Sequence, residues 1–149
     1  MKLNECINKV CCLYASDWHL AVMLLPYINK KIQEKNKIYM KFENSIEEKI
    51  QILIDKMELK NKNFINEIKW NENIQDEEMC ENEKIYIISG NEEFIEEKNN
   101  MIQEYYQNKD EKIKIINCYE INENSSQIDI IRENNYKTIL NTNGERVIC

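Results

Sequence analysis

The sequence predicts an α/β protein of three layers, in which a mainly parallel sheet of about six or seven strands carries helices on both faces. Three observations predict this class. Short apolar runs alternate with apolar stripes at helical spacing along most of the 149 residues. Most of these runs are continuous, which is typical of strands buried on both faces. An Asn-Gly pair near the end of the chain predicts a C-terminal hairpin. No linker or repeat interrupts this order, so residues 1–149 are expected to form one domain.

The first strand is predicted over 10–14, a continuous apolar run near the start of the chain. Ser16 or Asp17 can cap the helix that follows, because a short side-chain oxygen accepts hydrogen bonds from the free N–H groups of the first turn. Apolar residues recur at helical spacing over 18–32. Pro26 lies inside this helix and is expected to kink it.

The second strand is predicted over 37–42, where apolar and other side chains alternate. Ser45 and Glu48 have the spacing of a capping box at the start of a second helix, whose apolar stripe covers 46–57. A less regular apolar pattern predicts a third strand over 64–70. The polar and acidic stretch after it is expected to be a connector.

Strands and helices continue to alternate in the second half of the chain. Two further buried strands are predicted with an amphipathic helix between them, and a short helix and the hairpin complete the fold. The predicted ranges are 85–88 and 113–118 for the strands, 92–107 and 128–131 for the helices, and 138–140 with 147–149 for the hairpin.

Composition excludes several classes of partner. The chain has 27 acidic and 20 basic residues, a net charge of −7, and its lysines interleave with Glu and Asn instead of forming a basic stripe. Such a surface repels phosphate backbones, so we expect no nucleic-acid partner. The most apolar stretch, 20–28, is about half the length of a membrane span, so we expect no membrane insertion. The N-terminus lacks the apolar core of a secretory signal, which predicts a cytoplasmic protein.

Residues that hold cofactors and metals are scarce. Neither of the two glycines, Gly90 and Gly144, lies in a phosphate-binding loop or a dinucleotide-binding motif, so no cofactor is expected. The single histidine, His19, excludes metal sites that need two. The six cysteines contain no C-x-x-C pair, and Cys11 and Cys12 would point to opposite faces of a strand. We therefore expect buried free thiols and no metal site.

Polar and aromatic side chains follow the predicted strands at their carboxyl ends. In open α/β sheets ligands bind outside these ends, and helix N-termini there can hold an anion or carboxylate through free amides. Asp17 and Asn91 can equally be plain helix caps, the more frequent use of such residues. The candidate ligand-binding residues are Tyr14, Ser16, Asp17, His19, Ser89, Asn91, Cys118, Tyr119 and Glu120.

Several segments resemble the methanogen/methylotroph sensory domain, MEDS. Residues 12–17 (CLYASD) are similar to the family's LYxSD strand end, and 25–28 (LPYI) to its PF/PYI step. Residues 64–70, 93–106 and 116–120 are similar to the family's third strand, its EYExxLN helix and its LCQYD strand end.

The resemblance extends over nearly the whole chain. The closing segment, 128–140, is similar to the family's last helix and strand, with Asn135 and Tyr136 where the family has His-Pro. The resemblance implies a circularly permuted RecA-like fold that has lost its phosphate loop. It also implies a sensor of small molecules, which occurs alone or beside kinase or DNA-binding domains.

The leading hypothesis is a non-enzymatic sensory or regulatory module that binds a small ligand or a signalling protein, such as a kinase or a transcription regulator. An alternative is a thiol-dependent hydrolase or transferase with Cys118 as nucleophile and His19 as base, which requires the two side chains to lie within hydrogen-bond reach. A third is a structural or interaction protein without a ligand, such as a homodimer that pairs through the last hairpin strand.

Overall fold

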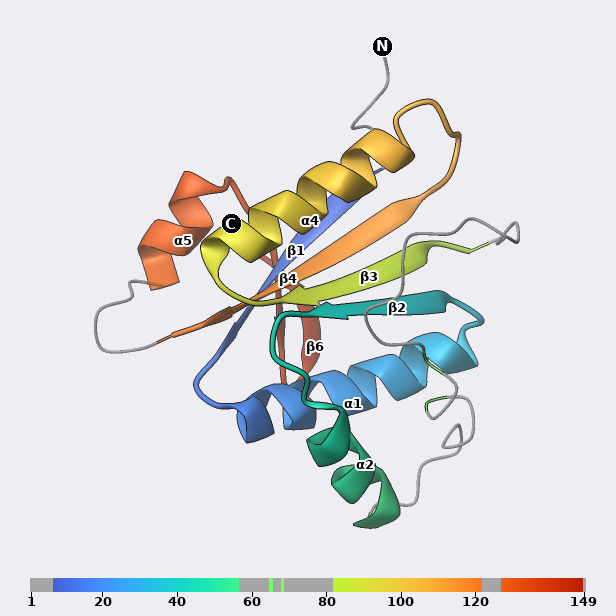
Figure 1. Ribbon diagram of the computed structural model, residues 1–149, viewed down its shortest axis with the longest axis vertical. Helices are drawn as coiled ribbons and strands as arrows, with labels where there is room; N and C mark the ends of the chain where they lie inside the picture. The colour runs from blue at the N-terminus through green and yellow to red at the C-terminus, as the bar shows by residue number, and fades with distance from the viewer. Residues whose placement is uncertain (1–6, 57–64, 66–67, 69–81, 122–126, 149) are drawn as a thin grey trace.

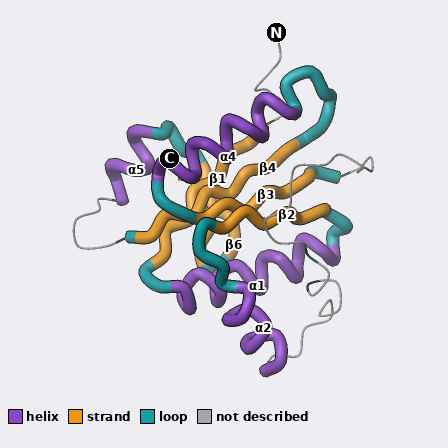
Figure 2. Tube along the Cα trace, viewed as in Figure 1, coloured by secondary structure: helices purple, strands orange, loops and turns teal. Residues whose placement is uncertain are grey.

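The computed structural model of the chain describes residues 7–56, 65, 68, 82–121 and 127–148. Within these residues the centre is a six-stranded sheet with the order β2-β3-β4-β1-β5-β6 (Figures 1 and 2). All neighbours pair in parallel except β5 and β6, which form an antiparallel hairpin at one edge. The strands are β1 (Ile7–Tyr14), β2 (Lys37–Phe42), β3 (Lys84–Ser89), β4 (Ile113–Glu120), β5 (Thr138–Asn141) and β6 (Gly144–Val147).

The helices pack against two separate core clusters, and Figure 1 shows them on either side of the sheet. Helices α1 and α2 share one cluster with strand residues such as Cys12 and Cys118. Helices α4 and α5 share the other with residues such as Cys11 and Tyr119. Neighbouring strand residues therefore bury their side chains on opposite faces, as the pleat of a strand requires. The bounds are α1 (Asp17–Gln33), α2 (Glu47–Lys56), α4 (Glu92–Tyr105) and α5 (Gln127–Glu133).

The α/β class, the mainly parallel sheet and the C-terminal hairpin are confirmed. Strand β1 begins at Ile7, before the apolar run, because Asn8 and Lys9 continue the pairing with β4 while their side chains stay exposed. The hairpin turns at Gly144, whose φ of 104° lies in the left-handed region that favours glycine. Of the third strand expected over 64–70, only two residues are described, and neither lies in a strand. The rest of that range, and most of the connector after it, lies outside the described residues.

Two details of the first helices bear on the prediction. Helix α1 continues through Pro26, so the proline does not end the helix. Pro26 and Val22, whose carbonyl loses its usual partner, are both exposed, so water can supply the missing hydrogen bond. At the start of α2, Ser45 Oγ accepts a hydrogen bond from the N–H of Glu47 at 3.2 Å instead of forming the expected box with Glu48.

Glu145 of β6 links the hairpin to β4 and α1 through side-chain hydrogen bonds. Both of its oxygens accept hydrogen bonds of 2.8 Å from Lys114 Nζ, and one accepts a bond of 2.9 Å from the Tyr27 hydroxyl. Burial alone would raise the pKa of Glu145, but these hydrogen bonds and the charges of Lys114 and Lys31 lower it below its ordinary value. The carboxylate therefore stays ionised and attaches the last strand to the core.

A second polar cluster lies inside the sheet face that α4 and α5 cover. Asn99 of α4 and Asn117 of β4 exchange amide hydrogen bonds of 2.8 and 3.1 Å. Asn117 also donates to the Tyr136 hydroxyl at 2.8 Å, and the hydroxyls of Tyr136 and Tyr119 lie 2.7 Å apart. All four side chains are buried. Buried polar groups are costly when unpaired, so this cluster specifies how α4 and the segment before β5 dock on the sheet.

We expect Glu145→Gln to lower the free energy of unfolding at neutral pH by about 2 kcal/mol, because the buried ammonium of Lys114 loses its main charged partner. In the wild type this stabilisation is present above the unfolded-state pKa of Glu, about 4.3, and is lost as the pH falls through the lower folded-state pKa. The difference between wild type and variant should therefore shrink below about pH 5. Urea unfolding over a pH series measures it, with the exposed Glu97→Gln as control. A difference that does not change with pH would contradict this role of the carboxylate.

Tyr136→Phe is expected to cost about 1–3 kcal/mol of stability, because it leaves the buried Asn117 amide and Tyr119 hydroxyl each short of a partner. The matched control is Tyr105→Phe, on a half-buried ring of the same layer that packs edge-on against its neighbour. Urea unfolding of both variants measures the difference. Equal effects in the two variants would show that the hydroxyl network does not stabilise the fold.

Candidate functional site

An open depression, here called the strand-end crevice, lies at the carboxyl ends of β1, β3 and β4. Its volume is about 360 Å³, within the usual range for small-molecule sites. The start of α1 and the segment after β2 contribute to its walls. Five of the nine candidate residues line it, namely Tyr14, Ser16, Asp17, Ser89 and Glu120, together with Ala15, Asn44, Ile46 and Gly90.

Tyr14 and Ser89 meet in the crevice although they belong to strands that are not neighbours. The Tyr14 hydroxyl lies 3.1 Å from Ser89 Oγ, and this contact joins the ends of β1 and β3 across β4. Both side chains are buried, at 5% and 4% exposure. Burial raises the pKa of Tyr14, so its phenol stays neutral at physiological pH. The pair can offer hydrogen-bonding groups to a ligand without adding charge.

Ser16 and His19 form the first turn of α1. Ser16 is the N-cap, and its Oγ accepts a hydrogen bond from the backbone N–H of His19 at 3.2 Å. His19 Nδ1 in turn accepts a bond from the N–H of Ala15 at 2.9 Å. Ser16 therefore both caps the helix and borders the crevice. His19 is outside the crevice lining, and its Nδ1 lone pair is used by the chain itself.

Asn91 has a structural role at the start of α4. Its side chain accepts the N–H of Phe94 at 2.8 Å, and its own backbone N–H donates to the Glu43 carboxylate at 2.9 Å. Gly90 lets these segments approach, because a Cβ there would come within 2.9 Å of Glu43 Cβ and closer still to the Phe94 ring. The alternative that Asn91 is a helix cap is confirmed, and the residue does not line the crevice.

The charge of the crevice is negative. Asp17 and Glu120 line it, whereas none of its lining residues is basic. The nearest cation recorded for either carboxylate in the described part of the chain is Lys49, whose Nζ lies 3.7 Å from Asp17 and over the Trp18 ring. Carboxylates of this kind repel phosphates and attract ammonium, guanidinium or hydroxyl groups. The anchoring of an anion at a helix N-terminus, which the sequence leaves open beside plain capping, is disfavoured here by these charges.

Cys118 lies beneath the crevice in the core and not in its lining. It is fully buried next to Cys12, its partner across the β1–β4 ladder. Burial, a hydrogen bond with Cys12 and the neighbouring thiols raise the pKa of Cys118 well above its ordinary value. Mainly through burial, the pKa of Cys11 on the opposite face rises to about 12. The cysteines of β1 and β4 are free and buried, as the sequence predicts for them, whereas Cys6, Cys80 and Cys149 lie outside the described residues.

Tyr119 faces the opposite side of the sheet from Tyr14. Its side chain belongs to the cluster under α4 and α5, where its hydroxyl contacts Tyr136. Burial raises the pKa of Tyr119 to about 12, so this phenol is neutral as well. The expectation that Tyr119 shares a site with Tyr14 is therefore wrong.

Two residues of the crevice lining are outside the nine candidates and lie in the segment that connects β2 to α2. These residues are Asn44 and Ile46.

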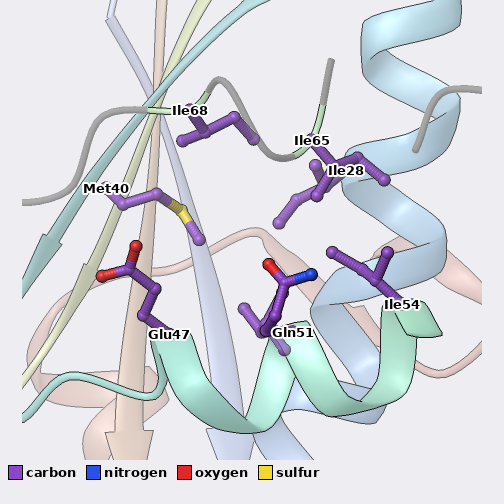
Figure 3. Close-up of a pocket in the computed structure, with 8 residues that line it drawn as sticks. Ile28, Met40, Glu47, Gln51, Ile54, Ile65 and Ile68 are labelled. Atoms are coloured by element: carbon purple, nitrogen blue, oxygen red, sulfur yellow. The ribbon is translucent and has the colours of Figure 1, made fainter. Parts of the chain in front are cut away.

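A second depression under α2 is too small for a ligand. Figure 3 shows Glu47 and Gln51 extending from the helix towards Met40 of β2 and a group of isoleucines. The free volume is about 20 Å³, roughly the space of one water molecule. We therefore treat this region as part of the packing between α1, α2 and β2.

Within the described residues, no group of three or more His, Cys, Asp or Glu side chains is arranged to hold a metal ion. No helix in the same part of the chain is long and apolar enough to cross a membrane. Comparison with protein-family models, curated proteins and solved structures gives no significant match for this chain. The MEDS resemblance therefore stays a prediction, and the crevice has to be interpreted from its own chemistry.

Proposed function

We propose that this chain is a non-enzymatic sensory or regulatory module that binds a small ligand in the strand-end crevice. The observation that carries the proposal is the meeting of five predicted residues in one open depression at the carboxyl ends of the strands. This is the place where parallel α/β sheets bind ligands. The residues come from β1, α1, β3 and β4, so one ligand can contact every central element of the fold.

The lining chemistry defines the class of ligand. Asp17 and Glu120 favour a cationic group, while Ser16, Asn44 and the Tyr14–Ser89 pair can bond hydroxyl or amide groups. Nucleotides and other phosphates carry the wrong charge for this lining. The ligand is therefore a small amine, an amino acid or a neutral polyol.

The proposal includes the wider properties that the MEDS resemblance implies. These are a circularly permuted RecA-like topology and a signalling partner such as a kinase or a transcription regulator. A cytoplasmic location, expected from the N-terminal sequence and not from the resemblance, also belongs to the proposal. The low glycine content of the chain supports the loss of a phosphate-binding loop. A ligand in the crevice would act on such a partner by shifting the population of conformations that the partner recognises.

The surroundings of Cys118 support a non-catalytic function. A nucleophilic cysteine needs an accessible thiolate and a base within hydrogen-bond reach. Cys118 is fully buried and its thiol is hydrogen-bonded to that of Cys12, while His19 Nδ1 accepts a hydrogen bond from the N–H of Ala15. The thiol enzyme is therefore a weaker hypothesis than the sensory module.

Thermal-shift screening tests the ligand proposal. We expect at least one compound from a panel of amino acids, polyamines, quaternary ammonium compounds and sugars to raise the Tm by roughly 5–10 °C near saturation. The double variant Asp17→Asn, Glu120→Gln should lose this shift, whereas Glu97→Gln on α4 should keep it. A panel that gives no shift, or a shift that survives in the double variant, would contradict binding in the crevice.

Alkylation of the folded protein separates the sensory module from the thiol enzyme. We expect Cys11, Cys12 and Cys118 to resist iodoacetamide at about pH 8 and to react only on unfolding in urea, because all three thiols are buried in the core and out of reach of the reagent. Peptide mass spectrometry measures the modification at each site. Rapid modification of Cys118 in the native state would instead support the enzyme.

A further inference from the structure

The structure has another depression at the opposite end of the strands from the crevice, beside the amino end of β1. This amino-edge pocket lies between the ends of α4 and α5 and the first residues of β1, and its volume is about 290 Å³. The space is larger than a bare inorganic anion needs and close to the lower limit for small-molecule sites. Its polar lining residues are Asn8, Lys9, Gln103, Asn134, Asn135 and Lys137.

The charge of this pocket is opposite to that of the strand-end crevice. Lys9 and Lys137 line it, and none of its lining residues is acidic. Within the part of the chain that the structure describes, no ion pair engages either ammonium. Although the Lys9 side chain as a whole is exposed, partial desolvation of its ammonium group lowers its pKa, and no carboxylate offsets this. An anion in the pocket would supply the missing opposite charge and stabilise both ammonium groups.

The helix ends that border the pocket do not oppose an anion strongly. Free carbonyls at a helix C-terminus carry partial negative charge, but those at the end of α5 are largely bonded. The Asn134 amide donates to the carbonyl of Ile130 at 2.9 Å, and the N–H groups of Asn135 and Tyr136 donate to the carbonyls of Arg132 and Ile131. The ammonium groups of Lys9 and Lys137 are therefore the only full charges among the lining residues of the pocket.

We propose that the amino-edge pocket binds a small organic phosphate, with Lys9 and Lys137 holding the phosphate group and the amide side chains contacting hydroxyl groups of the ligand. Lysine binds phosphate as a point charge, and a phosphate monoester carries a charge of about −1.5 to −2 at pH 7, which two ammonium groups can balance, whereas a single carboxylate carries −1. Asn8, Gln103 and Asn135 both donate and accept hydrogen bonds, as recognition of a polyol requires. This site is separate from the one in the proposed function and does not depend on it.

Titration of ¹⁵N-labelled protein with glycerol phosphate tests the proposal, with inorganic phosphate, glycerol and succinate as comparison probes. We expect saturable amide shifts confined to the start of β1, the end of α4 and residues 134–137. Glycerol phosphate should bind more tightly than any of the three comparison probes. Raising the salt concentration should weaken the binding, because the contact is ionic.

The double variant Lys9→Gln, Lys137→Gln should weaken glycerol phosphate binding by about tenfold or more, which corresponds to about 1.4 kcal/mol. Lys56→Gln, an exposed lysine on α2 at the other face of the sheet, makes a change of the same type outside the pocket and should leave the affinity unchanged. An unchanged Tm of each unliganded variant verifies that the fold is intact. Shifts scattered over many lysines, equal binding by the double variant, or binding of succinate as tight as that of glycerol phosphate would each overturn the proposal.

Discussion

In the centre of the sheet, β1 and β4 pair in parallel with Cys12 opposite Cys118 and Tyr14 opposite Glu120. Because side chains alternate along a strand, this register decides which face each residue reaches. Tyr14, Cys12 and Cys118 belong to the core under α1, whereas Tyr119 belongs to the core under α4. A shift of one residue would exchange these sets. The composition of the crevice and the burial of the thiols both follow from this pairing.

Two polar residues of β4 attach this central pair to the surrounding elements, one on each face. Lys114 reaches Glu145 of the hairpin on the α1 side, and Asn117 reaches Asn99 and Tyr136 on the α4 side. Leaving either group unpaired in the core would cost more than a lost surface contact. Alternative packings that separate these partners are therefore disfavoured, and the elements around the crevice keep one arrangement. A binding site needs such rigid support.

The sequence predicts the parts of the site that depend on local pattern. Asn91 could be identified as a helix cap, and the cap of the first helix could be narrowed to Ser16 or Asp17, because these residues precede apolar stripes at helical spacing. The structure shows that Ser16 is the cap. The face that Tyr119 occupies could not be predicted, because a strand buried on both sides shows no alternation of polar and apolar residues. The amino-edge pocket could not be predicted either. It places Lys9 in the same lining as Lys137, which lies near the other end of the chain, and this placement depends on the order of the strands.

The net charge of −7 and a phosphate site are compatible, because electrostatic fields in salt solution are local. Lys9 and Tyr14 lie near opposite ends of β1, about 17 Å apart at the usual rise of a strand. The Debye length at physiological ionic strength is about 8 Å, so the carboxylates of the crevice are largely screened at the amino edge. An extended polyanion such as a nucleic acid meets the summed surface charge and is repelled. A small phosphate meets only the two lysines of one pocket.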